Sequence, residues 1–243
     1  MKKDFFFLST IASLTVLTCL TGNLQPYDPF SNSEPQVTIT APLKNQHLRW
    51  NTTVAYTISV DDKEDGNTVF NEIQSSEVIL KVVFLPDSTT ALKKAQAPEP
   101  QGLSLIRTLD CFNCHGWKTT LMGPSFEMIA GRYPNNQASI QQLAGKIING
   151  SKGVWGPNQM PAHPDVKRTE ASQLVKWLLA EITNPDLVYL TGTEGVFRTK
   201  QKPTKNAGRG VYIITASYKD HGAKTSGDQK KIGSSTLLLK CEK

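Results

Sequence analysis

The spacing of apolar residues along the chain changes twice. Between residues 36 and 90, apolar and polar residues alternate in QVTITAP, TTVAYTISV and EVILKVVFLP, and this alternation predicts β-strands. Over residues 102–184 apolar residues instead recur every three or four positions, which predicts helices. Alternation returns within residues 185–243, in GVYIITASYKD and SSTLLLKC, and predicts two more strands.

Four short helices are expected in the middle part. The first carries Leu103 and Ile106 on one face, and the second begins near Phe126. The third lies in NNQASIQQLAGKIING, which starts with asparagines and ends with a glycine, and the fourth lies in LVKWLLAEI. Helices this short bury little apolar surface, so a large buried group would help to stabilise them.

Composition and charge narrow the range of partners. The chain has 243 residues, 38% of them hydrophobic, and a net charge of +6, which suits a soluble protein with two modest domains. Residues 1–100 carry 8 basic and 11 acidic groups, residues 101–184 carry 8 and 5, and residues 185–243 carry 11 and 5. Because no basic run is interleaved with aromatic residues, nucleic acid is not an expected partner. The basic excess instead suits an acidic protein surface.

Two cysteines and a histidine lie together in CFNCH, as Cys111, Cys114 and His115. A zinc site would need further ligands, and Cys19 and Cys241 are far away in the sequence. A thioredoxin-like pair would lie between a strand and a helix, whereas the preceding GLSLIRTLD is typical of a helix. Covalent haem uses all three residues, because two thiols add to its vinyl groups and the imidazole binds its iron. The spacing favours haem c, with zinc and a disulfide left open.

The stretch KGVWGPNQMPAHP supplies two candidates for a second axial ligand of the iron, Met160 and His163. Met160 lies in a loop rich in glycine and proline, which can wrap around the haem edge and present a thioether. Met122 is too close to the attachment site to reach the other face, and Met128 falls in an amphipathic helix where it fills space. We expect Met160 to be the ligand, with His163 as the alternative.

The middle part resembles a class I c-type cytochrome of the small bacterial monohaem kind. The resemblance rests on CFNCH, LMGPSF, KIINGSKGVWGPNQMP and LVKWLLAEI, in this order and spacing. It implies an all-α cytochrome c domain over residues 102–184 with axial ligands His115 and Met160. It also implies that the Pro124 carbonyl accepts a hydrogen bond from the histidine, and that Trp155 and Lys146 lie near the haem propionates.

The flanking strands resemble an immunoglobulin-like or PKD-like β module of exported multidomain proteins that are similar to sugar dehydrogenases. Residues 36–90 supply too few strands for a two-sheet sandwich, so we expect residues 185–243 to complete it. The expected fold class is α+β and multidomain, with the cytochrome domain inserted in or flanked by the β-sandwich. Residues 91–101 have the composition of a linker.

An electron carrier is the function that these features favour, rather than an enzyme. An iron with two protein ligands has no open site for a substrate, so it passes one electron at a time. Expected partners are an exported dehydrogenase as the donor, and a terminal oxidase or a peroxidase as the acceptor. The alternatives are a haem enzyme or gas sensor in which Met160 is labile, and a binding module for which the cytochrome relays electrons.

The beginning of the chain is typical of an export signal. MKKDFFFLSTIASLTVLTC has a basic start and an apolar stretch too short for a comfortable membrane span. Residues 1–19 therefore predict a lipoprotein-type signal, Cys19 a lipidated residue, and residues 20–35 a tether. A cleaved signal without a lipid and an uncleaved anchor are the alternatives. Each of these places the folded part outside the cytoplasm, on the periplasmic side of the membrane.

An acidic turn, DDKEDGN, separates two of the predicted strands. A calcium site at Asp61–Asp65 is one interpretation, but the turn lacks the full EF-hand pattern. We expect a solvated turn.

Overall fold

The computed structural model describes residues 31–86, 90–202, 210–223 and 230–241. The predicted signal of residues 1–19, its Cys19, and residues 20–30 of the tether lie outside the described residues. None of the described helices is long and apolar enough to cross a membrane.

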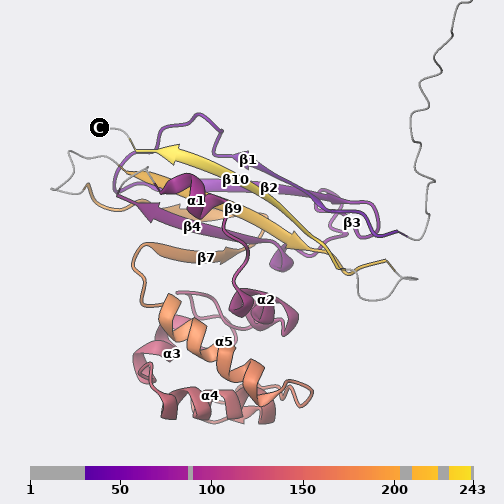
Figure 1. Cartoon of the computed structure of the whole chain (residues 1–243), viewed down its shortest axis with the longest axis vertical. Coiled ribbons are helices and arrows are strands. Elements are labelled where there is room, and N and C mark those ends of the chain that lie inside the picture. Colours follow the sequence, from indigo (N-terminus) through magenta and orange to yellow (C-terminus); the bar gives the residue numbers. More distant parts are fainter. Residues whose placement is uncertain (1–30, 87–89, 203–209, 224–229, 242–243) are drawn as a thin grey trace, which may run out of the picture.

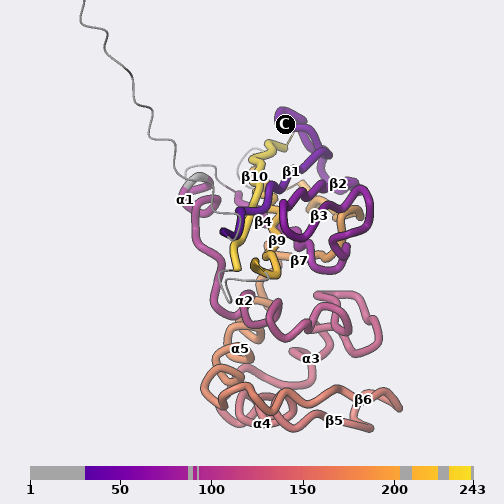
Figure 2. Tube along the Cα trace, turned by 90° about the vertical axis from the view of Figure 1, so that its right-hand side faces the viewer, coloured from indigo at the N-terminus to yellow at the C-terminus, as the bar shows by residue number. Residues whose placement is uncertain are grey.

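Two antiparallel four-stranded sheets lie face to face (Figures 1 and 2). In the first sheet, the central strand β2 (Thr53–Asp62) pairs with three strands: β1 (Gln36–Ala41), β3 (Gly66–Asn67) and β8 (Glu194–Arg198). The second sheet has the order β10-β9-β4-β7: β4 (Ile79–Leu85), β7 (Leu187–Thr191), β9 (Val211–Lys219) and β10 (Ile232–Lys240). Each sheet combines strands from before and after the helical part.

Strand β4 shows why the second sheet has apolar residues on both faces. Leu80, Val82 and Phe84 point into the core shared by the two sheets. The alternate residues Ile79 and Leu85 are also buried, but against elements outside the sandwich. A strand buried on both faces gives a nearly continuous apolar run, as in ILKVVFL.

The predicted strands are present, but within the two large sheets the sequence analysis missed three. Strands β1, β2, β4, β9 and β10 fall where alternation predicted them. Strand β3 has only two residues, and β7 and β8 lie in the stretch LVYLTGTEGVFR. The positive φ of 121° at Gly192 allows the sharp turn between β7 and β8, which belong to different sheets.

The helical part contains the four expected helices: α2 (Gln101–Thr108), α3 (Phe126–Arg132), α4 (Gln137–Asn149) and α5 (Arg168–Glu181). The side chain of Asn136 accepts a hydrogen bond of 2.9 Å from the Ser139 N–H and so caps α4, which ends at Gly150 with φ of 75°. The expectation of an all-α domain needs correction, because β5 (Ser151–Lys152) pairs with β6 (Gln159–Met160). A short 3₁₀ turn, η2 (Cys111–Asn113), carries the first cysteine of the motif.

The segment of residues 91–101, interpreted above as a linker, is partly helical. Helix α1 (Ala91–Ala95) occupies its first half, and α2 already begins at Gln101. Ala91 is buried against Leu85, Val211 and Ile213 on the outer face of the second sheet. This apolar contact explains why the segment folds onto the sheet although its composition is that of a linker.

The helical part is inserted between the neighbouring strands β4 and β7, and lies below the second sheet in Figure 1. Its first and last helices are in contact, since a Cβ at Gly102 would come within 2.3 Å of the Trp177 ring. Arg107 of α2 is buried and reaches the sandwich, where it donates to the Glu77 carbonyl at 3.2 Å and to the Ser217 hydroxyl. It also pairs with Glu99 at 3.1 Å, so the buried charge is compensated.

Candidate haem site

One large cavity lies in the helical part, with a volume of about 530 Å³. This volume falls in the usual range for cofactor sites, about 300–1,000 Å³. Helices α3, α4 and α5 supply a mostly apolar wall: Ile129, Leu143, Ile147, Leu174, Val175 and Leu178. The predicted site residues also line this cavity: Cys111, Cys114, His115, Pro124, Lys146, Trp155 and Met160. The structure thus brings them all together except Cys19, which is not among the described residues.

The orientation of the His115 ring is fixed from two sides. Its Nδ1 lies 2.7 Å from the carbonyl oxygen of Pro124, so Nδ1–H donates and Nε2 is left as the free lone pair. The ring of Phe126 stacks on it with centroids 5.5 Å apart and an interplanar angle of 23°. A Cβ at Gly123 would come within 2.6 Å of His115 Cε1, so only glycine lets the loop pass this close to the ring.

A small hairpin presents Met160 to the cavity. Met160 pairs with Ser151 across β5 and β6, and Gly150 precedes the hairpin in a positive-φ conformation. The side-chain amide of Asn158 donates to the Met122 carbonyl at 2.7 Å, which ties this hairpin to the loop after His115. His163, the alternative ligand, lines the same cavity. Asn158 was not singled out in the sequence analysis, because nothing local marks a contact 36 residues away.

Lys146 and Trp155 lie at the side of the cavity formed by α4 and the hairpin. The Lys146 ammonium donates to the Ser151 hydroxyl at 3.2 Å. Trp155 is 38% exposed, and the Arg132 guanidinium lies 5.0 Å from its ring centroid. Both side chains therefore border the cavity and have a polar or charged neighbour. This position suits a contact with the carboxylates of a cofactor in the cavity.

The alternatives to haem for CFNCH find no support in the structure. Cys111 and Cys114 are free thiols and form no disulfide. Burial raises the pKa of the Cys111 thiol to about 12, whereas a thioredoxin-like nucleophile needs a lowered pKa. No group of three or more His, Cys, Asp or Glu side chains within the described part of the chain is placed to hold a metal ion such as zinc. Two thiols and an imidazole beside an apolar cavity do fit covalent haem.

The fold and the cavity define a haem-binding helical domain joined to a β module. The family model for cytochrome c matches residues 101–180. Cytochrome c-551 of Pseudomonas aeruginosa is 34% identical over 98 residues, which cover 40% of this chain and 91% of that protein. Cytochrome c-552 of Nitrosomonas europaea is 37% identical over 75 residues, covering 31% and 73%. The crystal structure of the wild-type Nitrosomonas europaea cytochrome c552 shares 36% identity over 32% of this chain and 95% of that chain, with a TM-score of 0.30.

The chain belongs to the cytochrome c family through this segment. Its cofactor is the covalently bound haem c of that family, and the family relationship indicates an electron carrier. The match does not extend to the strands on either side, so their immunoglobulin-like or PKD-like character stays a prediction.

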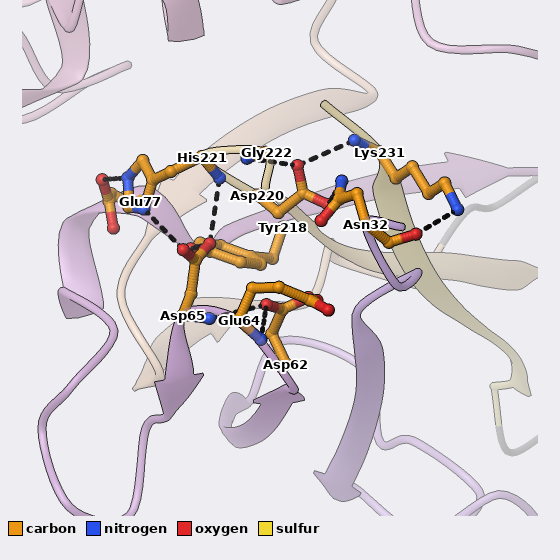
Figure 3. Close-up of polar contacts among 10 residues, drawn as sticks. All are labelled: Asn32, Asp62, Glu64, Asp65, Glu77, Tyr218, Asp220, His221, Gly222 and Lys231. Atoms are coloured by element: carbon orange, nitrogen blue, oxygen red, sulfur yellow. Dashed lines mark hydrogen bonds and ion pairs between the residues drawn. The ribbon is translucent and has the colours of Figure 1, made fainter. Parts of the chain in front are cut away.

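A second polar cluster lies where the acidic turn meets the end of β9 (Figure 3). Asp65 accepts hydrogen bonds from the Tyr218 hydroxyl at 2.8 Å and from the His221 backbone N–H at 2.9 Å. The His221 ring lies 3.2 Å from Asp65 and 2.9 Å from Glu77. Asp62 is only 3% exposed and accepts bonds from the backbone of its own turn.

The expectation of a solvated turn is therefore wrong for Asp62, which is buried, and for Asp65, which bonds to residues at the end of β9. The calcium interpretation gains no support either, because no described cluster of His, Cys, Asp or Glu is placed to hold a metal ion.

We expect the His221 cluster to make the free energy of unfolding depend on pH. Burial lowers the pKa of His221, but the hydrogen bond to Glu77 and the charge of Asp65 outweigh it, so the pKa is raised overall. A group whose pKa is raised by folding makes its full contribution to stability below the pKa that it has in the unfolded chain, which is about 6.5 for histidine. This contribution is lost as the pH rises through the pKa of the folded state. We expect His221→Asn to remove this loss of stability above pH ~6.5 in urea unfolding of the holoprotein.

Substitution of the exposed His47, which lies outside this cluster, by asparagine is the matched control. If His221→Asn and the wild type show the same dependence on pH, the ion pairs contribute nothing in solution.

Proposed function

We propose that the chain is an exported, membrane-anchored carrier of single electrons. Cys111 and Cys114 hold haem c through thioether bonds, and His115 and Met160 are the axial ligands of its iron. The observation that carries the proposal is that all four side chains line one cavity, in which His115 already has its Nδ1 committed to Pro124.

The residues of the chain prepare the site for electron transfer without binding a substrate. When bound, haem supplies one iron that alternates between the ferrous and ferric states. The Pro124 carbonyl orients the imidazole and leaves Nε2 as the lone pair that would hold the iron, and the apolar walls would keep water away from it. A thioether ligand and a dry pocket both favour the ferrous state, which gives a relatively positive reduction potential. Lys146 and Trp155, which line the same cavity, would lie near the propionates.

The cavity opens beside an exposed apolar rim that suits brief docking of a redox partner. Met122 and Trp155 line the cavity and are 63% and 38% exposed, and Leu121 next to them is 47% exposed. Arg132 and Lys152 lie at the same rim and supply positive charge. An apolar centre with basic neighbours matches a partner whose surface is apolar and acidic. An exported dehydrogenase as the donor and a terminal oxidase or peroxidase as the acceptor fit this chemistry.

The proposed location of the protein rests on the sequence that precedes the folded part. The basic and apolar start of the chain and Cys19 favour a lipid-anchored protein on the periplasmic side, with the polar residues 20–35 as its tether. The proposal includes an immunoglobulin-like or PKD-like module formed by the flanking strands, which pair across the insertion of the cytochrome domain.

One spectrum of the purified holoprotein tests the proposed ligation. Ferric haem with a methionine ligand shows a weak absorption band at the red end of the visible spectrum, and a six-coordinate ferrous iron does not bind carbon monoxide readily. We expect the band to be present and carbon monoxide to bind poorly. A protein without the band that binds carbon monoxide at once would be a haem enzyme or a gas sensor.

A further inference from the structure

Trp117 is buried in a place that haem binding does not explain. It follows the proposed ligand His115 by two residues and is only 2% exposed. Trp117 is not among the residues that line the haem cavity. Its ring packs instead against Tyr189, with centroids 4.8 Å apart and an interplanar angle of 69°.

Tyr189 belongs to the β module. It lies on β7, the edge strand of the second sheet that faces the helices in Figure 1, and is 1% exposed. Trp177 of α5 completes the contact, with its centroid 6.2 Å from Trp117 and 6.0 Å from Tyr189. Three aromatic rings thus join the loop after His115, the last helix and the sheet. Edge-to-face and tilted ring pairs of this kind contribute beyond the burial of their area.

The loop after His115 restricts how far Trp117 and His115 can move relative to each other. His115 and Thr120 form an antiparallel bridge, which closes a tight loop around Trp117. The Trp117 carbonyl accepts a bond of 3.1 Å from the Glu127 N–H, and the Gly116 carbonyl accepts one of 3.0 Å from the Phe126 N–H. Phe126 contacts both rings, since its centroid lies 6.0 Å from Trp117 and 5.5 Å from His115.

We infer that Trp117 is a positioning residue through which the β module holds the iron-ligating histidine. The Tyr189 ring fixes Trp117, and the short loop and Phe126 transmit this restraint to the plane of the His115 ring. The sheet therefore sets the strength of the iron–histidine bond and so the reduction potential. The inference rests on the proposed role of His115 as a ligand.

The test compares substitutions in the full-length holoprotein on the two sides of the contact. We expect Trp117→Ala and Tyr189→Leu each to change the equilibrium between oxidised and reduced protein by about threefold or more, since groups that orient a metal ligand have effects of this size or larger. The paramagnetic NMR signals of the His115 ring should shift in both. Trp117→Phe keeps the ring contact and should stay close to the wild type.

Trp50→Ala is the matched control. Trp50 packs on Phe84 in the other core, with centroids 5.8 Å apart, so this substitution should lower the melting temperature and leave the potential unchanged. If Trp117→Ala fails to fold, Tyr189→Leu alone decides, because Tyr189 lies outside the haem cavity.

If Tyr189→Leu is less stable but keeps the reduction potential and the His115 signals of the wild type, the inference is wrong and the proposed ligation is unaffected. If the wild-type protein shows no paramagnetic NMR signal of the His115 ring, His115 is not a ligand of the iron, and the proposed ligation is wrong as well.

Discussion

Substitution of Met160 by alanine should convert the site from an electron carrier into an open haem. The β5–β6 hairpin holds Met160 at the cavity, and alanine leaves no donor atom there. The ferrous protein should then bind carbon monoxide, and the red-end ferric band should disappear. The reduction potential should fall by on the order of 0.1 V or more, because axial ligands move haem potentials over a range of about 0.8 V. Redox titration and the spectrum of the purified variant measure both effects.

Two substitutions separate this result from a general loss of packing. Met128 is 46% exposed on α3 and its sulfur accepts a bond from the Thr120 hydroxyl, so Met128→Ala should change neither the band nor the potential. His163 lines the same cavity, and His163→Ala should also keep the band. If His163→Ala opens the iron and Met160→Ala does not, the ligand assignment is reversed.

The helical domain was predictable because its signals are local. Asn136 and Gly150 mark the two ends of α4 in the sequence, and both act as its caps in the structure. The residues expected at the haem site also come from short motifs whose spacing follows the shape of the cofactor. The sequence favoured Met160 over His163 as the second ligand, and this choice stays a prediction, since both line the cavity.

The contacts between the two parts of the molecule could not be predicted in this way. Trp117 and Tyr189 are 72 positions apart, and no periodicity links them. Arg107 is typical of a surface residue, yet it is buried against the sandwich with Glu99 as its partner. Ala91 of α1 is buried against the outer face of the second sheet, although the segment has the composition of a linker. In each case the contact is tertiary and leaves no local signal in the sequence.

The helical domain should not remain folded without its cofactor. Helices α3, α4 and α5 turn apolar side chains toward the cavity of about 530 Å³, so haem would supply a large part of the core of this small domain. Domain stabilities are only about 5–15 kcal/mol, so the loss of that part of the core should unfold it. The core between the two sheets consists of strand and loop residues outside the helical part, so it does not depend on haem.

Replacement of both Cys111 and Cys114 by serine should therefore unfold the helical domain and spare the sandwich. We expect loss of covalent haem on a denaturing gel, loss of most helical circular dichroism, and rapid proteolysis within residues 102–184. Fragments from residues 36–90 and 185–243 should stay associated, because their strands pair within both sheets. Cys241→Ser is the control: this cysteine is buried in the sandwich after β10, away from the helical part, so the variant should keep its haem and its helices. A double serine variant that keeps covalent haem and its full helix content would contradict the assignment of the two thiols. Separation of the two β fragments after cleavage would show instead that the sheets need the helical domain.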